Sequence, residues 1–93
     1  MTLAVRHTSA FKRDYKRLLK RGFPLAKLHA VVAKLCNGEE LAPANRDHAL
    51  SGVWSAHREC HIAPDWLLIY KIHADVLILE LTRSGSHSDL FGN

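Results

Sequence analysis

The chain has 93 residues, of which 47% are hydrophobic and 24% charged, as in an ordinary globular protein, and we expect one domain over residues 1–93. Thirteen lysines and arginines against nine carboxylates give a formal net charge of +4, which favours polyanionic partners such as nucleic acid. Apolar runs fall short of the roughly 20 residues of a membrane span, no signal peptide is recognisable and two cysteines allow at most one disulfide, so we expect a reduced, cytoplasmic protein with no membrane partner.

A short strand over residues 2–7 and two helices are expected in the first third of the chain. The first helix can be capped by Thr8 or Ser9, and its apolar side chains recur at helical spacing at Phe11, Tyr15, Leu18 and Leu19. Gly22-Phe23-Pro24 ends this helix and starts a second one, whose apolar stripe spans residues 25–36. Two adjacent amphipathic helices predict a helical hairpin that covers one face of a sheet.

The basic face of the first predicted helix leaves two interpretations open. It is either an ordinary solvated surface or a surface that contacts phosphates, where each contact adds to a salt-dependent affinity for nucleic acid. Only Asp14 interrupts its six cations, which are Lys12, Arg13, Lys16, Arg17, Lys20 and Arg21.

The rest of the chain is typical of a loop followed by antiparallel strands. Residues 39–51 have no sustained period and predict a long loop. Alternating polarity predicts a strand over residues 53–62, with His57, Glu59 and His61 on an open face. Ala63-Pro64 predicts a tight turn into an apolar central strand over residues 67–72, and a third strand follows at residues 76–81. The predicted fold is therefore α+β, with two N-terminal helices packed on a small, twisted, mainly antiparallel sheet.

Several side chains suited to proton transfer fall near the ends of these strands. Cleavage of an RNA phosphodiester without a metal needs a base for the 2′-hydroxyl proton, an acid for the 5′-oxygen and cations for the phosphate. Trp66 and Phe91 can stack an unpaired base, although Trp66 fits a core position equally well. The candidate acid–base residues are His48 in the loop, His61 and Asp65 around the turn, and His87 after the last strand.

A metal or organic cofactor is not expected from these residues. His57 and His61 have the spacing of a helical chelate, but on a strand that spacing is about 13 Å, too far for one ion. Cys36 and Cys60 are predicted to point toward the helices, which also argues against a cysteine nucleophile. The sequence contains no glycine-rich phosphate loop.

Three segments of the chain resemble the YafQ branch of the RelE/ParE toxin superfamily, in the same order and over almost the full length. The resemblance implies a RelE-like, microbial-ribonuclease-like α+β fold and a type II toxin–antitoxin toxin. Such a toxin is a ribosome-dependent endoribonuclease that cuts translated mRNA in the A site of the small subunit, and an acidic antitoxin neutralises it. The segments are Asp47-His48-Ala49-Leu50, Trp54 through Arg58 into His61-Ile62-Ala63-Pro64-Asp65-Trp66-Leu67-Leu68-Ile69-Tyr70-Lys71, and Arg83-Ser84-Gly85-Ser86-His87-Ser88-Asp89-Leu90-Phe91-Gly92.

The same resemblance implies roles for individual residues. We take His87 as the general acid and Asp65 or His61 as the base, with a hydrogen bond between His61 and Asp65 orienting the imidazole. His48 and Arg83 are expected to steady the phosphate. The positions implied to be catalytic are His48, His61, Asp65 and His87, and those implied to bind substrate are Trp66, Arg83 and Phe91.

A function of a different class is the alternative. The related ParE branch keeps this fold but is a non-enzymatic toxin that targets gyrase and lacks the histidine set. The presence of His48, His61, Asp65 and His87 argues for the endoribonuclease.

Overall fold

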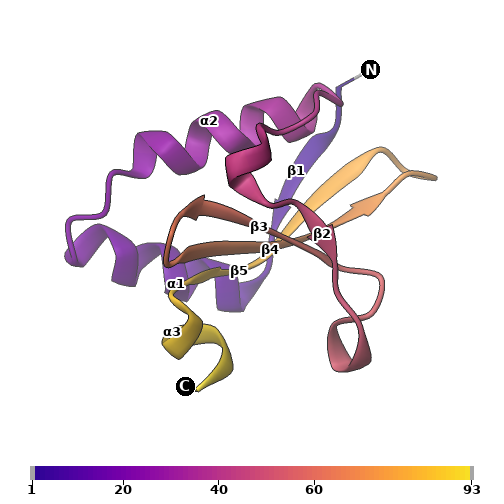
Figure 1. Ribbon diagram of the computed structural model, residues 1–93. Coiled ribbons are helices and arrows are strands. Elements are labelled where there is room, and N and C mark those ends of the chain that lie inside the picture. Colours follow the sequence, from indigo (N-terminus) through magenta and orange to yellow (C-terminus); the bar gives the residue numbers. More distant parts are fainter. Residues whose placement is uncertain (1, 93) are drawn as a thin grey trace.

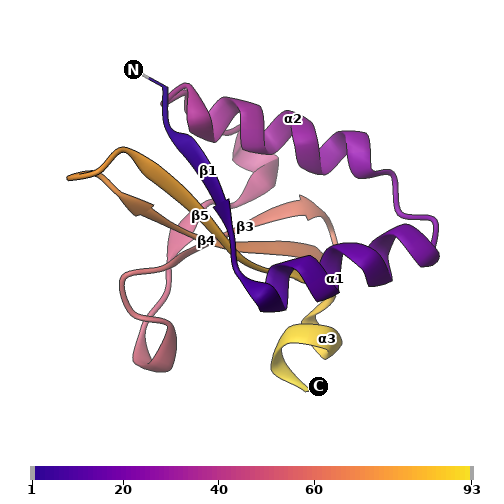
Figure 2. The same ribbon diagram turned by 180° about the vertical axis from the view of Figure 1, so that it is seen from behind.

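Two helices cover one face of a mixed sheet of five strands in the computed structural model, which describes residues 2–92 (Figures 1 and 2). The strand order is β1-β5-β4-β3-β2; β1 runs parallel to β5, and the other neighbours are antiparallel. The α+β prediction with a mainly antiparallel sheet is confirmed. In chain order the elements are β1 (Ala4–His7), α1 (Ser9–Lys20), α2 (Leu25–Cys36), the 3-10 turn η1 (Pro43–Asn45), β2 (His48–Ala49), the 3-10 turn η2 (Gly52–Trp54), β3 (Arg58–Ala63), β4 (Trp66–His73), β5 (Ile78–Gly85) and α3 (His87–Phe91).

The two long helices form the predicted hairpin, and Figure 2 shows both on one side of the sheet. Thr8 caps α1, because its hydroxyl oxygen accepts the backbone N–H of Phe11 at 3.0 Å. Leu19 was expected on the apolar face but is 62% exposed, whereas Asp14, on the basic face, is buried. No helix within residues 2–92 has the length and apolarity that a bilayer crossing requires.

Strand β4 is the centre of the sheet and of the core. Residues 66–70 are all buried, since β4 has β3 on one side and β5 on the other. Alternate side chains of β4, such as Leu68 and Tyr70, join a core with Phe11 and Leu18 of α1 and with apolar residues of α2. This packing holds the ends of β3, β4 and β5 in one place, where the turn after β3 and helix α3 both lie.

The predicted boundaries of β3 are wrong at its N-terminal end. The predicted strand began at residue 53, but η2 and a turn occupy the first part, and the strand begins at Arg58. Gly52 and Ala56 have positive φ angles of 67° and 69°, which an extended strand does not allow. The predicted loop also contains β2, in which His48 pairs with Glu59 of β3.

Candidate active site

Asp65 and His87 form the closest pair of the predicted acid–base residues. Asp65 lies in the turn between β3 and β4, and His87 is the first residue of α3, which follows β5 directly. One carboxylate oxygen, Oδ1, accepts the backbone N–H of His87 at 3.1 Å and lies 2.8 Å from its ring atom Nδ1. Because an ionised carboxylate only accepts hydrogen bonds, Nδ1 carries the hydrogen and Nε2 is the ring nitrogen left for chemistry.

The prediction of a hydrogen bond between His61 and Asp65 is wrong, because the partner of Asp65 is His87. Asp65 bonds to His87, because the first turn of α3 offers both a free backbone N–H and an imidazole. His61 nevertheless lies beside this pair, with its ring centroid 5.9 Å from that of His87. Phe91 is the last residue of α3, and its ring centroid lies 6.3 Å from that of His87.

Glu59 is a member of the site that the sequence analysis missed. Its carboxylate oxygen Oε1 lies 3.4 Å from Nε2 of His48 and 4.0 Å from Nε2 of His61, and the residue is only 6% exposed. The alternation along β3 had already put Glu59 on the same face as His61, so the signal was present in the sequence. The Glu59 carboxylate therefore lies between the two imidazoles and links His48 of β2 to His61 of β3.

The contact between His48 and the backbone indicates which of its ring nitrogens carries the hydrogen. Its Nδ1 lies 2.6 Å from the carbonyl oxygen of Arg46, which can only accept a hydrogen bond. Nδ1 of the neutral ring therefore carries the hydrogen, and the lone pair is on Nε2, the atom that faces Glu59. The geometry suits a group that takes up a proton at Nε2 and is then stabilised by Glu59.

Trp66 is not available to stack a base, so this part of the prediction is wrong. The residue is 2% exposed and lies in the core, where its indole meets the ring of Phe23 edge-on at a centroid distance of 5.1 Å. Its Nε1–H donates to the hydroxyl oxygen of Ser84 at 3.0 Å. The alternation along β4 turns this side chain toward the helices. Phe91, which is 38% exposed, remains the predicted stacking aromatic.

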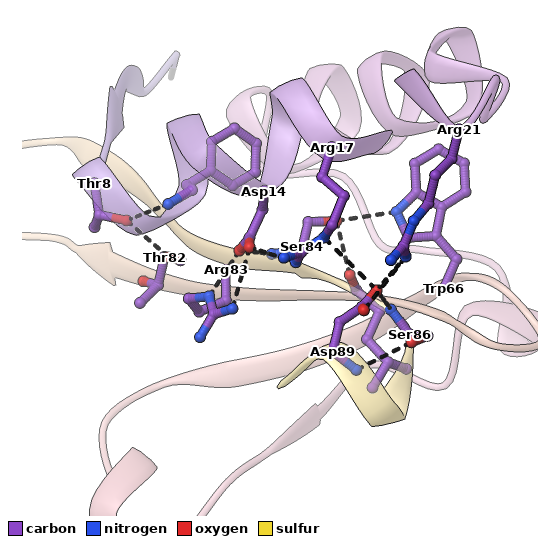
Figure 3. Close-up of polar contacts among 12 residues, drawn as sticks. Thr8, Asp14, Arg17, Arg21, Trp66, Thr82, Arg83, Ser84, Ser86 and Asp89 are labelled. Carbon is purple, nitrogen blue, oxygen red and sulfur yellow. Dashed lines mark hydrogen bonds and ion pairs between the residues drawn. The ribbon is translucent and has the colours of Figure 1, made fainter. Parts of the chain in front are cut away.

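Arg83 is engaged with helix α1. Its Nε and Nη2 donate to the carboxylate of Asp14 at 2.7 and 3.1 Å, as Figure 3 shows. The hydrogen bond from Arg83 to Asp14 raises the pKa of the guanidinium, which stays charged. Both of its described hydrogen bonds thus go to an internal partner, and a phosphate contact through the rest of the guanidinium remains a prediction.

Two hollows in the described surface differ in what they can bind. The larger, about 600 Å³, is apolar, lies against α1, α2 and β1 and includes none of the predicted site residues. The smaller, about 460 Å³, includes His61 and two cations, Lys27 and Arg46. A hollow that joins an imidazole to two positive charges suits a phosphate backbone better than the larger hollow does.

Neither thiol is suited to nucleophilic chemistry. Burial raises the pKa of Cys60 to about 12, with a further contribution from the charges of Asp47 and Glu59. Burial also raises the pKa of Cys36. Thiolates are the nucleophilic form, so both thiols are unreactive at neutral pH. Within residues 2–92, no three His, Cys, Asp or Glu side chains are grouped so as to hold a metal ion.

The pKa of Asp65 provides a direct test of the hydrogen-bonded pair that this residue forms with His87. The side-chain and backbone hydrogen bonds from His87 lower the pKa of Asp65. We expect the Asp65 carboxyl to titrate below its ordinary value of about 3.9, measured by its carbon chemical shift in an NMR pH titration. Because the folded pKa is lowered, the stabilisation by this pair is present above the unfolded pKa and is lost as pH falls through the folded one. In His87→Ala the midpoint should rise, and an unchanged midpoint would show that the pair does not form.

The fold and the site together define a class of protein: a small basic α+β domain with two helices behind a mixed sheet and an acid–base cluster at one end of the strands. The comparisons with known proteins give the family within this class. The family model described as the bacterial toxin of type II toxin–antitoxin system, YafQ, matches residues 3–92. The chain therefore belongs to the YafQ family of type II toxin–antitoxin toxins, and the resemblance read from the sequence is confirmed.

Individual relatives agree in sequence and in structure. The mRNA interferase toxin YafQ of Escherichia coli strain K12 is 36% identical over 89 residues, which is 95% of each chain. The crystal structure of a metal-bound toxin from Helicobacter pylori has 44% identity and a TM-score of 0.91, covering 96% of this chain and 99% of that one. The toxin in the E. coli DinJ-YafQ toxin–antitoxin complex has 32% identity and a TM-score of 0.88, covering 99% and 100%.

Proposed function

We propose that the protein is an endoribonuclease, an mRNA interferase that cuts translated mRNA in the A site of the small ribosomal subunit. The observation that carries the proposal is the meeting of three histidines and two carboxylates around one end of the sheet, with His87 bonded to Asp65 and His48 facing Glu59. The names of the curated E. coli relatives, mRNA interferase toxins, support the same reaction.

The first proton transfer is proposed for His48, with His61 beside it. Nε2 of His48 takes the proton of the 2′-hydroxyl, and the 2′-oxygen attacks the adjacent phosphorus. Glu59 stabilises the imidazolium that forms, because its carboxylate lies 3.4 Å from Nε2 of His48. Asp65 or His61 was expected from the sequence to be the base, and His48 to be a phosphate contact. These roles are revised, since Asp65 is already hydrogen-bonded to His87 and Glu59 lies nearer to His48 than to His61.

The second proton transfer is proposed for His87. Its Nε2–H donates a proton to the leaving 5′-oxygen as the bond between phosphorus and that oxygen breaks, and a 2′,3′-cyclic phosphate remains. Asp65 accepts from Nδ1–H, which orients the ring and stabilises its charged form before transfer. Neither step uses a metal ion or an organic cofactor.

The RNA is held by charge and stacking in this proposal. Arg83, Lys27 and Arg46 offset the charge that develops on the phosphate, and Phe91 stacks a base next to His87. The exposed lysines and Arg13 of α1 add a general attraction to ribosomal RNA.

We propose two macromolecular partners besides mRNA. One is the ribosome, and the other is a cognate acidic antitoxin that neutralises the toxin. The net charge of +4 supports an acidic partner. The E. coli relative has been crystallised in a complex of this kind with DinJ. A cytoplasmic location follows from the proposed ribosomal partner.

The proposal is tested by incubating the purified protein with a reporter mRNA in a reconstituted translation system and mapping the 5′ ends of the fragments. We expect cuts within translated codons, none when ribosomes are omitted, and the same pattern from the control variant His57→Ala, a histidine outside the site. Intact mRNA together with inhibited gyrase supercoiling would favour the ParE-like alternative. Equal cutting of naked RNA would contradict ribosome dependence.

A further inference from the structure

Asp14 is a carboxylate buried inside a basic helix face. It is 2% exposed, although it lies among the cations of α1. Its Oδ1 accepts from Nη2 of Arg17 at 2.7 Å and from Nη2 of Arg83 at 3.1 Å. Its Oδ2 accepts from Nε of Arg83 at 2.7 Å and from the backbone N–H of Ser84 at 3.0 Å. Four donors therefore satisfy the two oxygens, as Figure 3 shows.

This arrangement determines where the guanidinium of Arg83 lies. A buried charge is tolerated only when it is paired and hydrogen-bonded. The paired bond from Nε and Nη2 fixes both the position and the plane of the guanidinium, which a single point contact does not do. The bond from the N–H of Ser84 ties the same carboxylate to the backbone of β5 next to Arg83.

The network continues from Asp14 to the helix that carries His87. Arg17 binds Asp14 and also lies near Asp89, with 4.0 Å between its Nε and Oδ2 of Asp89. Arg21 donates to the same oxygen at 3.0 Å. Asp89 in turn accepts the backbone N–H of Ser86 at 3.0 Å and completes the capping box of α3, directly before His87. Figure 3 shows this continuous row of charges from β5 along α1 to α3.

We propose that Asp14 is a positioning residue for the RNA-cleavage site. It holds Arg83 in the orientation needed to meet the phosphate and, through Arg17 and Asp89, holds the start of α3 and thus His87. Asp14 itself does not touch RNA. The proposal rests on the proposed function, and it explains why a single carboxylate interrupts the basic stripe of α1.

Asp14→Asn is the informative variant, because asparagine keeps the size and one acceptor oxygen but removes the charge. We expect single-turnover cleavage of ribosome-bound mRNA to fall by on the order of 10–10²-fold, the effect of a misplaced group, with ribosome affinity unchanged. Asp75→Asn on the exposed turn after β4 makes the same change in net charge away from the network and should cleave like the wild type. Equal cleavage by the two variants would overturn the proposal.

A double-variant comparison tests whether Asp14 acts through Arg83. In an Arg83→Gln background, Asp14→Asn should add only the smaller loss that acts through Arg17 and Asp89, because the bond between Asp14 and Arg83 is already gone, so the combined loss should be less than the product of the two single losses. Losses that multiply would overturn the proposal. If Asp14→Asn does not fold, Arg83→Lys serves instead: it keeps a cation but cannot form the paired bond. Wild-type cleavage by Arg83→Lys would then show that the pairing is not needed.

One readout does not depend on activity, so the two proposals can fail separately. The Nε–H of Arg83 should give a slowly exchanging NMR signal in the wild type and exchange faster in Asp14→Asn, where one neutral oxygen replaces the two charged ones. A protected signal together with a wild-type protein that cuts no mRNA would refute the proposed function and leave the Arg83 position intact. An exchange rate in Asp14→Asn equal to that of the wild type would refute the positioning role of Asp14.

Discussion

Replacing His87 with alanine should lower single-turnover cleavage of ribosome-bound mRNA by about 10²–10⁴-fold, the usual worth of one general acid or base. His87 is placed by α3 and its ring by Asp65, so the variant loses the proton donor while the fold is kept. Association with ribosomes should be unchanged, because the variant keeps the exposed lysines and Arg13 of α1, which are proposed to attract ribosomal RNA. Rapid-quench kinetics with excess enzyme and a pelleting assay for ribosome binding measure the two quantities.

Asp65→Asn is the companion variant for His87. An amide keeps a hydrogen-bond acceptor for Nδ1 but lacks the charge that stabilises the imidazolium, so we expect a smaller loss of cleavage than in His87→Ala. His57→Ala is the matched control, because it removes a histidine outside the site. Wild-type cleavage by His87→Ala would remove His87 from the mechanism, and a parallel loss of ribosome binding would mean that its role is in docking.

Replacing Trp66 with alanine should destabilise the protein by about 3–5 kcal/mol, the usual effect of deleting a buried tryptophan side chain. The indole is 2% exposed, packs against Phe23 and donates to Ser84, so truncation leaves a cavity and removes the hydrogen bond that the Ser84 hydroxyl accepts. The free energy of unfolding is obtained from urea denaturation monitored by circular dichroism. A change below about 1 kcal/mol would be inconsistent with a core position.

A comparison of the variants Trp66→Phe and Phe91→Ala distinguishes a role in core packing from a role in base stacking. Trp66→Phe should lower stability less than alanine does and retain cleavage, because the side chain does not reach the RNA. Phe91→Ala should have the opposite profile, with little change in stability and a clear loss of cleavage, because Phe91 is exposed beside His87. A loss of cleavage in a stable Trp66→Phe protein would restore Trp66 as a substrate-binding residue.

Elements with a local signal were predicted well from the sequence. The helical spacing of apolar residues and the cap at Thr8 located α1, and the Ala63-Pro64 turn located the connection between β3 and β4. The start of β3 was misplaced because polarity alternates through residues 53–57, while the positive φ angles of Gly52 and Ala56 bend the chain there. Alternation describes polarity, and only the backbone conformation decides where pairing begins.

The residues of the candidate site were predicted more accurately than the hydrogen bonds between them. His48, His61, Asp65 and His87 were all singled out, and the structure gathers them with Glu59 at one end of the sheet. The bond between His61 and Asp65 was inferred from their closeness in the chain. The actual partner of Asp65 comes from 22 residues further along, because β5 returns α3 to the β3–β4 turn.

The sequence by itself determined the family, the helical hairpin, the central apolar strand and the set of titratable side chains, because each depends on local spacing or on a contiguous motif. Only the tertiary structure decided which of those side chains are paired. Trp66 became a core residue because the alternation of β4 turns it toward the helices. Asp14 became the partner of Arg83, 69 residues away, because α1 packs against β5 and a buried carboxylate there requires a cation. Such pairings depend on contacts between distant segments, which no local pattern in the chain specifies.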